Sequence, residues 1–192
     1  MTEADVLRIF TETGALLRGH FELRSGLHSD QFFQCAKVLQ HPRRTAALCG
    51  ELAERLRRDC PAAGEAQTVI APAMGGLFVG HELARALDRK SIFAEKQDNA
   101  LVLRRGFTIT PGEKFIVAED VVTRGGRVQE TLDILARAGG VPIAVAVLVD
   151  RSGGAAKFTA PVFSLLRMTP VTWAPDACPL CAAGGRPEHP GS

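Results

Sequence analysis

Apolar segments alternate with amphipathic helical patterns from Thr68 to Val149, and this alternation constrains the fold more than any other feature of the chain. Apolar strands that are connected through helices form mainly parallel sheets, with helices covering both faces. We therefore predict an α/β fold built on a mainly parallel sheet, whose ligands would lie beyond the carboxyl ends of the strands. The predicted strands cover residues 68–71, 91–94, 114–118 and 141–149, and the predicted helices cover 75–87 and 126–138.

The two ends of the chain give weaker patterns. Thr2 and Asp5 have the spacing of a capping box, which predicts a helix start. The Gly- and Pro-rich residues 184–192 predict a flexible tail, and all 192 residues are expected to form a single domain. The remaining expected elements are a helix over residues 2–13, extended segments at 21–24 and 31–34, and a helix over 42–58.

The composition excludes several classes of protein. A formal net charge of +2 argues against a dedicated nucleic-acid surface, and no long apolar segment predicts a membrane span. The N-terminal residues lack the basic segment and apolar core of a secretory signal, which favours a cytoplasmic location. The patterns GxGxxG, Walker A and GxSxG do not occur, so the sequence carries no motif for a dinucleotide, a P-loop or a nucleophile elbow.

The five cysteines are scattered along the chain, and their odd number does not predict a disulfide framework. Cys178 and Cys181 form a CxxC pattern that suggests zinc, but a structural zinc site needs four ligands. The sequence offers no second CxxC and no HxxxH nearby, and His189 is the one histidine close by along the chain. We therefore predict that protein side chains alone hold no metal.

The segment from Phe115 to Arg127 predicts a site for a phosphorylated sugar. Glu119 and Asp120 stand where the apolar strand should end, and carboxylates accept hydrogen bonds from sugar hydroxyls. The turn that follows carries the hydroxyl of Thr123, and it leads into a helix whose first N–H groups suit a phosphate. The glycines of the turn, Gly125 and Gly126, allow the backbone to approach an anion, and Arg124 and Arg127 add charge. The alternative interpretation is a surface turn with two solvated acids.

Two further segments have features that suit an anion. Residues 71–76, which include Ala73 and Met74, lead from a strand into a helix through two glycines. They either present N–H groups to pyrophosphate or form a tight turn that packing requires. Lys96 precedes a polar stretch that Arg104 and Arg105 follow, as in a loop that closes over a ligand. The alternative is an exposed hairpin with solvated charges, which is the favoured interpretation for the two arginines.

Two other segments suit a flat, negatively charged ring. His28 lies in a polar turn before Phe32 and Phe33, and an aromatic face can stack on such a ring. The alternative is a turn that caps two core phenylalanines. Arg151 follows a long strand and either contacts a carboxylate or carbonyl of a ligand or forms a salt bridge with Asp150 or another acid.

These segments together resemble type I phosphoribosyltransferases, and among them the orotate phosphoribosyltransferases. The Phe115–Arg127 segment resembles the signature for 5-phosphoribosyl-1-pyrophosphate (PRPP), although relatives usually have small or hydroxyl residues where Arg124 and Arg127 stand. The order and spacing of the segments agree over nearly the whole chain. The other similar segments are 25–34 (orotate side), 71–87 (pyrophosphate loop), 93–107 (mobile loop) and 149–154 (a substrate-contacting arginine).

The resemblance implies Mg-dependent transfer of the phosphoribosyl group from PRPP to N1 of orotate, giving orotidine 5′-monophosphate and pyrophosphate in pyrimidine biosynthesis. The implied catalytic residues are Lys96, Asp120 and Glu119. The implied PRPP contacts are Glu119, Asp120, Thr123, Arg124, Gly125, Gly126, Arg127, Ala73, Met74 and Lys96. The implied orotate contacts are His28, Phe32, Phe33, Thr123 and Arg151.

The family also implies features that the residues alone do not predict. They are Mg²⁺ held mainly through PRPP and water, a strained or cis peptide near Met74, and a hood formed by about residues 1–40 and part of the C-terminal segment. The family further implies a homodimer in which a mobile loop, about residues 96–105, reaches the neighbouring subunit's site. Two alternatives stay open: a transferase for another base, such as a purine, and a PRPP-sensing regulator without activity.

Overall fold

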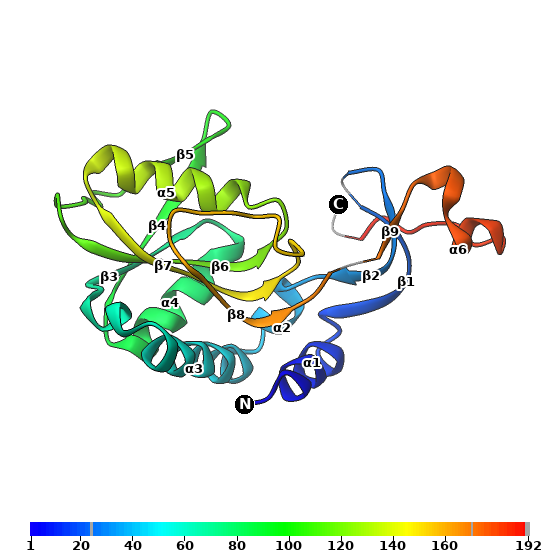
Figure 1. Cartoon of the computed structure of the whole chain (residues 1–192), viewed down its shortest axis with the longest axis horizontal. Helices are drawn as coiled ribbons and strands as arrows, with labels where there is room; N and C mark the ends of the chain where they lie inside the picture. Colours follow the sequence, from blue (N-terminus) through cyan, green and yellow to red (C-terminus); the bar gives the residue numbers. More distant parts are fainter. Residues whose placement is uncertain (24, 170, 191–192) are drawn as a thin grey trace.

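The computed structural model describes residues 1–23, 25–169 and 171–190, and a six-stranded sheet runs through its body (Figure 1). The strand order is β5-β4-β3-β6-β7-β8, and every neighbouring pair is parallel except β4 and β5. The predicted parallel α/β sheet is therefore confirmed. The strands are β3 (Thr68–Pro72), β4 (Lys90–Gln97), β5 (Ala100–Leu103), β6 (Lys114–Val122), β7 (Val141–Asp150) and β8 (Val162–Arg167).

Helices cover both faces of this sheet. Helices α3 (Pro42–Asp59) and α4 (Gly75–Leu87) pack on one face, where Leu48, Leu52 and Leu83 are fully buried in the largest core cluster. Helix α5 (Gly126–Ala138) covers the other face and buries Leu135 against β6 and β7. The leucines of α3 recur at helical spacing, which explains why one side of the helix faces the sheet.

The first helix and the first short helix also belong to the body. Helix α1 (Glu3–Glu12) starts at the predicted capping box of Thr2 and Asp5, and its Val6 and Phe10 are fully buried in the largest core cluster. Helix α2 (Ala36–Leu39) was not predicted, and its buried residues lie in the same cluster. Residues 1–40 are therefore not all part of the hood.

The hood is a three-stranded sheet with the order β1-β2-β9, together with the short helix α6, and it stands to the right of the body in Figure 1. Its strands come from both ends of the chain and pair in an antiparallel way. The carboxyl ends of β6 and β7 point toward the hood (Figure 1). Its elements are β1 (Leu16–Glu22), β2 (His28–Phe33), β9 (Thr172–Trp173) and α6 (Pro179–Ala182).

The predicted loose tail is attached to the hood as far as Glu188. The N–H of Glu188 donates to the carbonyl of His20 at 2.8 Å, and the carbonyl of Glu188 accepts from the N–H of Glu22 at 2.9 Å. The difference arises because the edge of β1 offers unpaired backbone groups that Gly- and Pro-rich chain can still bond. Residues 191 and 192 of the predicted tail lie outside the described residues.

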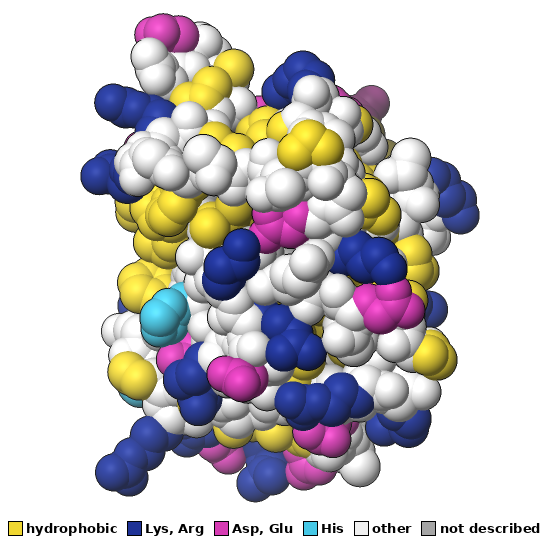
Figure 2. Space-filling view, turned by 90° about the vertical axis from the view of Figure 1, so that its left-hand side faces the viewer, with side chains coloured by type: hydrophobic (Ala, Val, Ile, Leu, Met, Phe, Trp, Pro, Cys, Tyr) yellow, Lys and Arg dark blue, Asp and Glu magenta, His cyan; other side chains and the backbone are white. Residues whose placement is uncertain are grey.

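The amino ends of the parallel strands lie at the end of the molecule away from the hood. Acidic and basic side chains intermingle on this end (Figure 2). Lys90 pairs there with Glu113 at 2.8 Å, and Lys114 pairs with Glu65. These charges pair with one another, so this end presents no gathered basic surface.

The helices and strands agree closely with the sequence in the body and less closely elsewhere. Helices α4 and α5 have the predicted bounds, and β3, β4 and β7 differ by a few residues. The sequence missed β8, β9 and α6, as well as the 3₁₀ turns Pro61–Glu65 and Pro175–Ala177. No helix among the described residues has the length and apolar character needed to cross a membrane.

Candidate functional site

The acid pair lies inside strand β6 rather than after it. The strand was expected to end at Ala118, but Val121 and Val122 continue the pairing with β7, so the ladder carries the backbone past both acids. Glu119 is 5% exposed, and Asp120 is half-buried. Both carboxyl groups accept hydrogen bonds from neighbouring backbone N–H groups. The interpretation as two solvated surface acids is therefore wrong for Glu119.

Burial changes the protonation of this pair. It raises the pKa of Glu119 to about 9, and the charge of Asp120 adds to the rise. Burial also raises the pKa of Asp120. Two buried carboxyl groups side by side disfavour a second negative charge, and a ligand that brings hydroxyl donors or a cation relieves that cost. The acid pair is therefore suited to bind a ligand that supplies hydrogen-bond donors or a cation.

The acid pair lies directly against the start of helix α4. A Cβ atom at Gly75 would be 3.0 Å from Oδ1 of Asp120, and one at Gly76 would be 2.9 Å from Oε1 of Glu119. Glycine at these positions allows the turn to approach the carboxylates. The peptide between Ala73 and Met74 is cis, as the resemblance implied. The two segments that the sequence singled out separately thus form one surface.

Both α4 and α5 begin without a side-chain cap. The residues before them are Met74 and Gly125, and neither caps the first turn with a side-chain hydrogen bond. The first N–H groups of a helix have no partner inside the helix, so an uncapped start suits an anion. Gly125 has a φ of 80°, and a Cβ there would lie 2.6 Å from Cζ of Phe158. Only glycine therefore fits the turn before α5.

The side chains of this turn extend into solvent. Thr123, Arg124 and Arg127 are exposed. Arg127 makes one long ion pair, 3.9 Å from Nη1 to Oε2 of Glu130, which leaves most of its donors free. The charge of Arg127 reaches the acid pair, because it lowers the pKa of Glu119, although burial outweighs it.

Arg151 follows β7 and lies on the aromatic side of the site. Its guanidinium carbon is 5.1 Å from the centroid of the Phe33 ring, and its Nε is buried without a hydrogen-bond partner among the described residues. Burial lowers the pKa of Arg151. The carboxylate of Asp150 instead accepts from the N–H of Ser152 at 2.9 Å. The alternative of a salt bridge between Arg151 and Asp150 is therefore not what the structure shows.

The acid pair and Arg151 both act on the thiol of Cys35. Burial raises the pKa of the Cys35 thiol well above its ordinary value. The charges of Asp120 and Glu119 add to that rise, whereas the charge of Arg151 opposes it. Cys35 is thus near both the acid pair and the arginine, which places them in one region. Sequence reasoning gave Cys35 no role.

His28 faces away from this region. It is 4% exposed, and its Nδ1 lies 3.0 Å from Nε2 of His20 and 3.3 Å from Sγ of Cys181. Phe32 is half-buried and contacts Phe21, with ring centroids 6.0 Å apart. Among the aromatic candidates from this segment, Phe33 is the residue that the structure brings to Arg151. The expected contact between His28 and a substrate gains no support.

The segment that contains Lys96 forms a hairpin rather than an open loop. Strands β4 and β5 pair from Ala94 to Leu103, and the turn between them consists of Asp98 and Asn99, both with positive φ. Glu95 pairs with Arg104 at 3.8 Å and with Arg105 at 3.0 Å. This agrees with the interpretation of the two arginines as charges on an exposed hairpin. Lys96 is exposed, and it has no ion-pair partner within the described part of the chain.

Comparison with known proteins agrees with this geometry. Residues 36–180 match the family model described as the phosphoribosyl transferase domain. The chain is 47% identical over 192 residues to an orotate phosphoribosyltransferase of Desulforamulus reducens, covering 100% of this chain and 98% of that protein. It is 48% identical over 188 residues to the enzyme of that name from Carboxydothermus hydrogenoformans, covering 98% and 97%.

A solved structure shares the fold. The crystal structure of orotate phosphoribosyltransferase from Aeropyrum pernix matches with a TM-score of 0.72 at 23% identity, over 85% of this chain and 93% of that one.

Proposed function

The chain belongs to the phosphoribosyltransferase family, and from that premise we infer that it is an orotate phosphoribosyltransferase, an enzyme of pyrimidine biosynthesis. The reaction joins N1 of orotate to C1 of the ribose of PRPP and releases pyrophosphate. The observation that carries this inference is the buried acid pair of β6 lying against the uncapped start of α4. Full-length similarity to relatives of that name supports the choice of orotate as the base.

The chemistry needs position and charge more than a covalent nucleophile. Positive charge develops on the ribose ring as pyrophosphate leaves, so the protein gains most by holding the sugar in place and stabilising that charge. We propose that Asp120 and Glu119 accept hydrogen bonds from the ribose hydroxyls. Their raised pKa values support this role, because a buried carboxyl without a partner is unfavourable.

The two uncapped helix starts suit the two phosphate groups of PRPP. We propose that the turn from Thr123 to Arg127 binds the 5′-phosphate, with Arg124 and Arg127 adding charge. We propose that Ala73, Met74 and the start of α4 bind pyrophosphate. The support is that neither helix has a side-chain cap, so each presents backbone N–H groups to an anion.

Arg151 and Phe33 suit the base. The buried Nε of Arg151 has no partner among the described residues, and orotate carries a carboxylate and carbonyl oxygens that accept hydrogen bonds. The flat ring of orotate would lie against the aromatic side of the site that Phe32 and Phe33 form, near Thr123. We do not extend this role to the side chain of His28.

Mg²⁺ fits the donor set of the site. Two carboxyl groups supply oxygen, the ligand that Mg²⁺ prefers, and PRPP and water would supply the rest. The residues that would hold it are Asp120 and Glu119, through the ribose hydroxyls. When bound, Mg²⁺ neutralises charge on the leaving pyrophosphate.

Lys96 of one subunit would contact the pyrophosphate bound in the site of the neighbouring subunit. We propose a homodimer in which the segment from about 96 to 105 reaches the partner's site, and a cytoplasmic location. The support for the dimer is that the β4–β5 hairpin projects from the body above α5 and that Lys96 is exposed (Figure 1). The free ammonium group of Lys96 would then neutralise charge that develops as pyrophosphate leaves.

An assay with orotate, PRPP and Mg²⁺ tests the proposed function, with orotate consumption followed by absorbance. We expect turnover that requires all three components. Turnover with adenine or hypoxanthine in place of orotate would instead support a transferase for another base. Binding of PRPP without turnover of any base would support a regulator and would contradict the proposed activity.

A further inference from the structure

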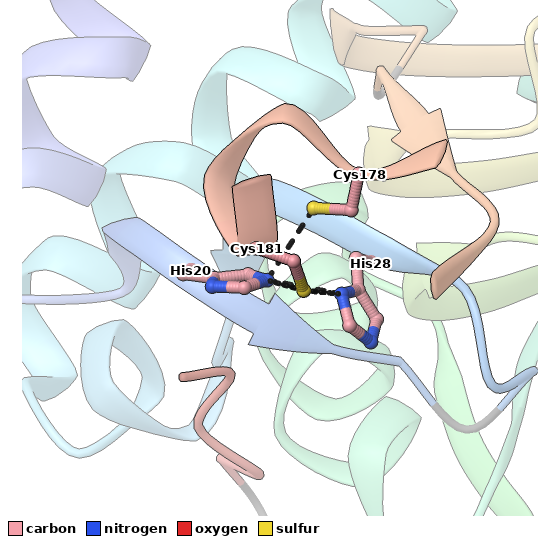
Figure 3. Close-up of side chains that lie close together, drawn as sticks. All are labelled: His20, His28, Cys178 and Cys181. Carbon is pink, nitrogen blue, oxygen red and sulfur yellow. Dashed lines mark hydrogen bonds between the residues drawn. The ribbon is translucent and has the colours of Figure 1, made fainter. Parts of the chain in front are cut away.

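Four possible metal ligands from both ends of the chain converge in the hood, outside the site described above. His20 lies on β1, His28 begins β2, Cys178 precedes α6, and Cys181 lies within α6. One nitrogen from each ring and the two sulfur atoms all lie within 4.8 Å of one another. Figure 3 shows the four side chains directed at a common point. We propose that these residues bind one Zn²⁺ in a closed structural site.

Four of the six distances between these atoms are close to those of a tetrahedral zinc site, and the other two are at most 4.8 Å. With Zn–N near 2.05 Å and Zn–S near 2.3 Å, the expected separations are about 3.3 Å between nitrogens and about 3.6 Å between nitrogen and sulfur. Nε2 of His20 lies 3.0 Å from Nδ1 of His28, 3.5 Å from Sγ of Cys178 and 3.6 Å from Sγ of Cys181. Sγ of Cys181 lies 3.3 Å from Nδ1 of His28. Four donors already in these positions need little rearrangement to accept the ion.

The charges and the burial also suit zinc. Two thiolates balance the charge of Zn²⁺, and two neutral imidazoles complete a neutral group, which is favourable in a buried place. His28 is 4% exposed and Cys178 is 3% exposed. Binding releases the two thiol protons to water and changes no oxidation state. Because four protein ligands fill the tetrahedron, the ion has no open position for a substrate, so its role is structural.

The chain packs tightly around one of the rings. A Cβ at Gly185 would lie 3.3 Å from Nδ1 of His20 and 2.9 Å from the carbonyl oxygen of Leu180. A side chain at position 185 would therefore displace either the ring or the end of α6. This packing fixes the ring so that Nε2 faces the other three ligands.

A metal ion would stabilise the hood, because the outer part of the hood has little hydrophobic core of its own. Two of its buried hydrophobic residues, Phe21 and Cys178, belong to none of the three core clusters. Strand β9 pairs with β2 through two residues, Thr172 and Trp173. Small units that cannot build a sufficient core are commonly held by a metal or a disulfide. A zinc ion would join β1 and β2 to a segment that lies 158 residues further along the chain from His20.

The first experiment uses the wild-type full-length chain, purified without added chelator. We expect about one zinc per chain by elemental analysis, released when an organomercurial blocks the thiols. Refolding with Co²⁺ should give the visible spectrum of a tetrahedral thiolate–imidazole site. Because this experiment needs no variant, a misfolded mutant cannot obscure the result.

The second experiment compares matched variants. Cys181→Ser and His20→Ala should each lose the stoichiometric zinc and the thiolate charge-transfer band of the Co²⁺ form. His41→Ala, which removes an exposed histidine at the start of α3, should keep both. Far-UV circular dichroism of each variant checks that the body is folded when zinc is measured.

Several outcomes would overturn the inference. One is wild-type protein that contains no metal and binds none when Zn²⁺ is supplied to the reduced chain. Another is a Cys178–Cys181 disulfide in protein isolated without oxidant, which would leave two fewer than the five free thiols on titration in denaturant. Retention of stoichiometric zinc by both Cys181→Ser and His20→Ala would also contradict it.

Discussion

The body and the hood are stabilised in different ways. The body buries large side chains such as Leu83, Phe115 and Leu148 completely, in clusters that span the sheet and its helices. The hood joins short strands from the two ends of the chain, and its outer part contributes Phe21 and Cys178 to no core cluster. Hydrophobic burial accounts for the body and for the inner end of the hood, where Leu16 and Phe33 join the largest core cluster. The outer part of the hood depends instead on strand pairing, the contact with Glu188 and the four-residue cluster.

This difference coincides with a division of the proposed site. The acid pair and the two uncapped helix starts, which are the proposed sites for the sugar and its phosphates, belong to the body. Phe32 and Phe33, which we propose to lie on the side of the base, belong to β2 at its opposite end from His28. Loss of the hood should therefore weaken the binding of orotate far more than the binding of PRPP. The predictions below test this division, in order of decreasing effect.

The largest effect is expected from Asp120→Asn, in the body. The substitution removes a charged acceptor for the ribose hydroxyls, so turnover should fall by about 100- to 1000-fold. Steady-state assay with orotate and PRPP measures the change. Zinc content and the circular dichroism spectrum should stay as in the wild type, since Asp120 lies outside the hood. Unchanged kinetics would remove the acid pair from the mechanism.

Removal of zinc from the hood should mainly raise the KM for the base, orotate. Wild-type protein treated with a strong chelator, and the Cys181→Ser variant, should both show a KM for orotate raised about 10-fold or more, because β2 is no longer held in position. The KM for PRPP should change by less than about 2-fold, because the body keeps its own core. Equal losses for both substrates would break the division between hood and body.

Arg127→Ala tests the phosphate side alone. Loss of a charge-assisted hydrogen bond should raise the KM for PRPP about 10-fold, with little change for orotate. Arg137→Ala, at the far end of the same helix, is the matched control and should leave both values unaltered. A comparable loss for both substrates in Arg127→Ala would argue against a contact with the 5′-phosphate.

The smallest effect concerns the stability of the body. The pKa of Glu119 is raised from an ordinary 4.5 to about 9, so the folded chain keeps a proton that the unfolded chain loses between these values. The free energy of unfolding therefore falls as the pH rises through this window. Glu119→Gln should be about 0.5–2 kcal/mol more stable than the wild type at pH 8 and should show no gain at pH 4.

Denaturant unfolding of the ligand-free protein measures this change. Glu54→Gln, an exposed acid on α3, should alter stability little at either pH. A gain of equal size at pH 4 and pH 8 would show that the effect has another cause than the proton on Glu119.

The sequence predicted the body well because its signals are local. The bounds of α4 and α5 follow from glycines and apolar periodicity within each segment. Strand β6 proved longer than expected, because pairing of Val121 and Val122 with β7 outweighs the local appearance of a strand end. Strand β8 was missed, since its pairing with β7 is not visible in its own residues.

The cluster in the hood was missed for a related reason. The search for zinc ligands looked near Cys178 and Cys181 along the chain and found His189, whereas the partners are His20 and His28. These histidines come together because β1 and β2 pair across a turn, with Glu22 opposite His28. A CxxC near one end of the chain and two histidines on adjacent extended segments near the other would have been the signal to test.

The contact between β1 and Glu188 has a consequence for synthesis of the protein. Strand β1 leaves the ribosome before the six-stranded sheet of the body, but β9 and the two cysteines of the proposed zinc site emerge after it. The body is able to form before β1 and β2 meet Cys178 and Cys181, because its last strand, β8, ends at Arg167. The hood, the proposed base-binding part, would thus complete its folding after the body.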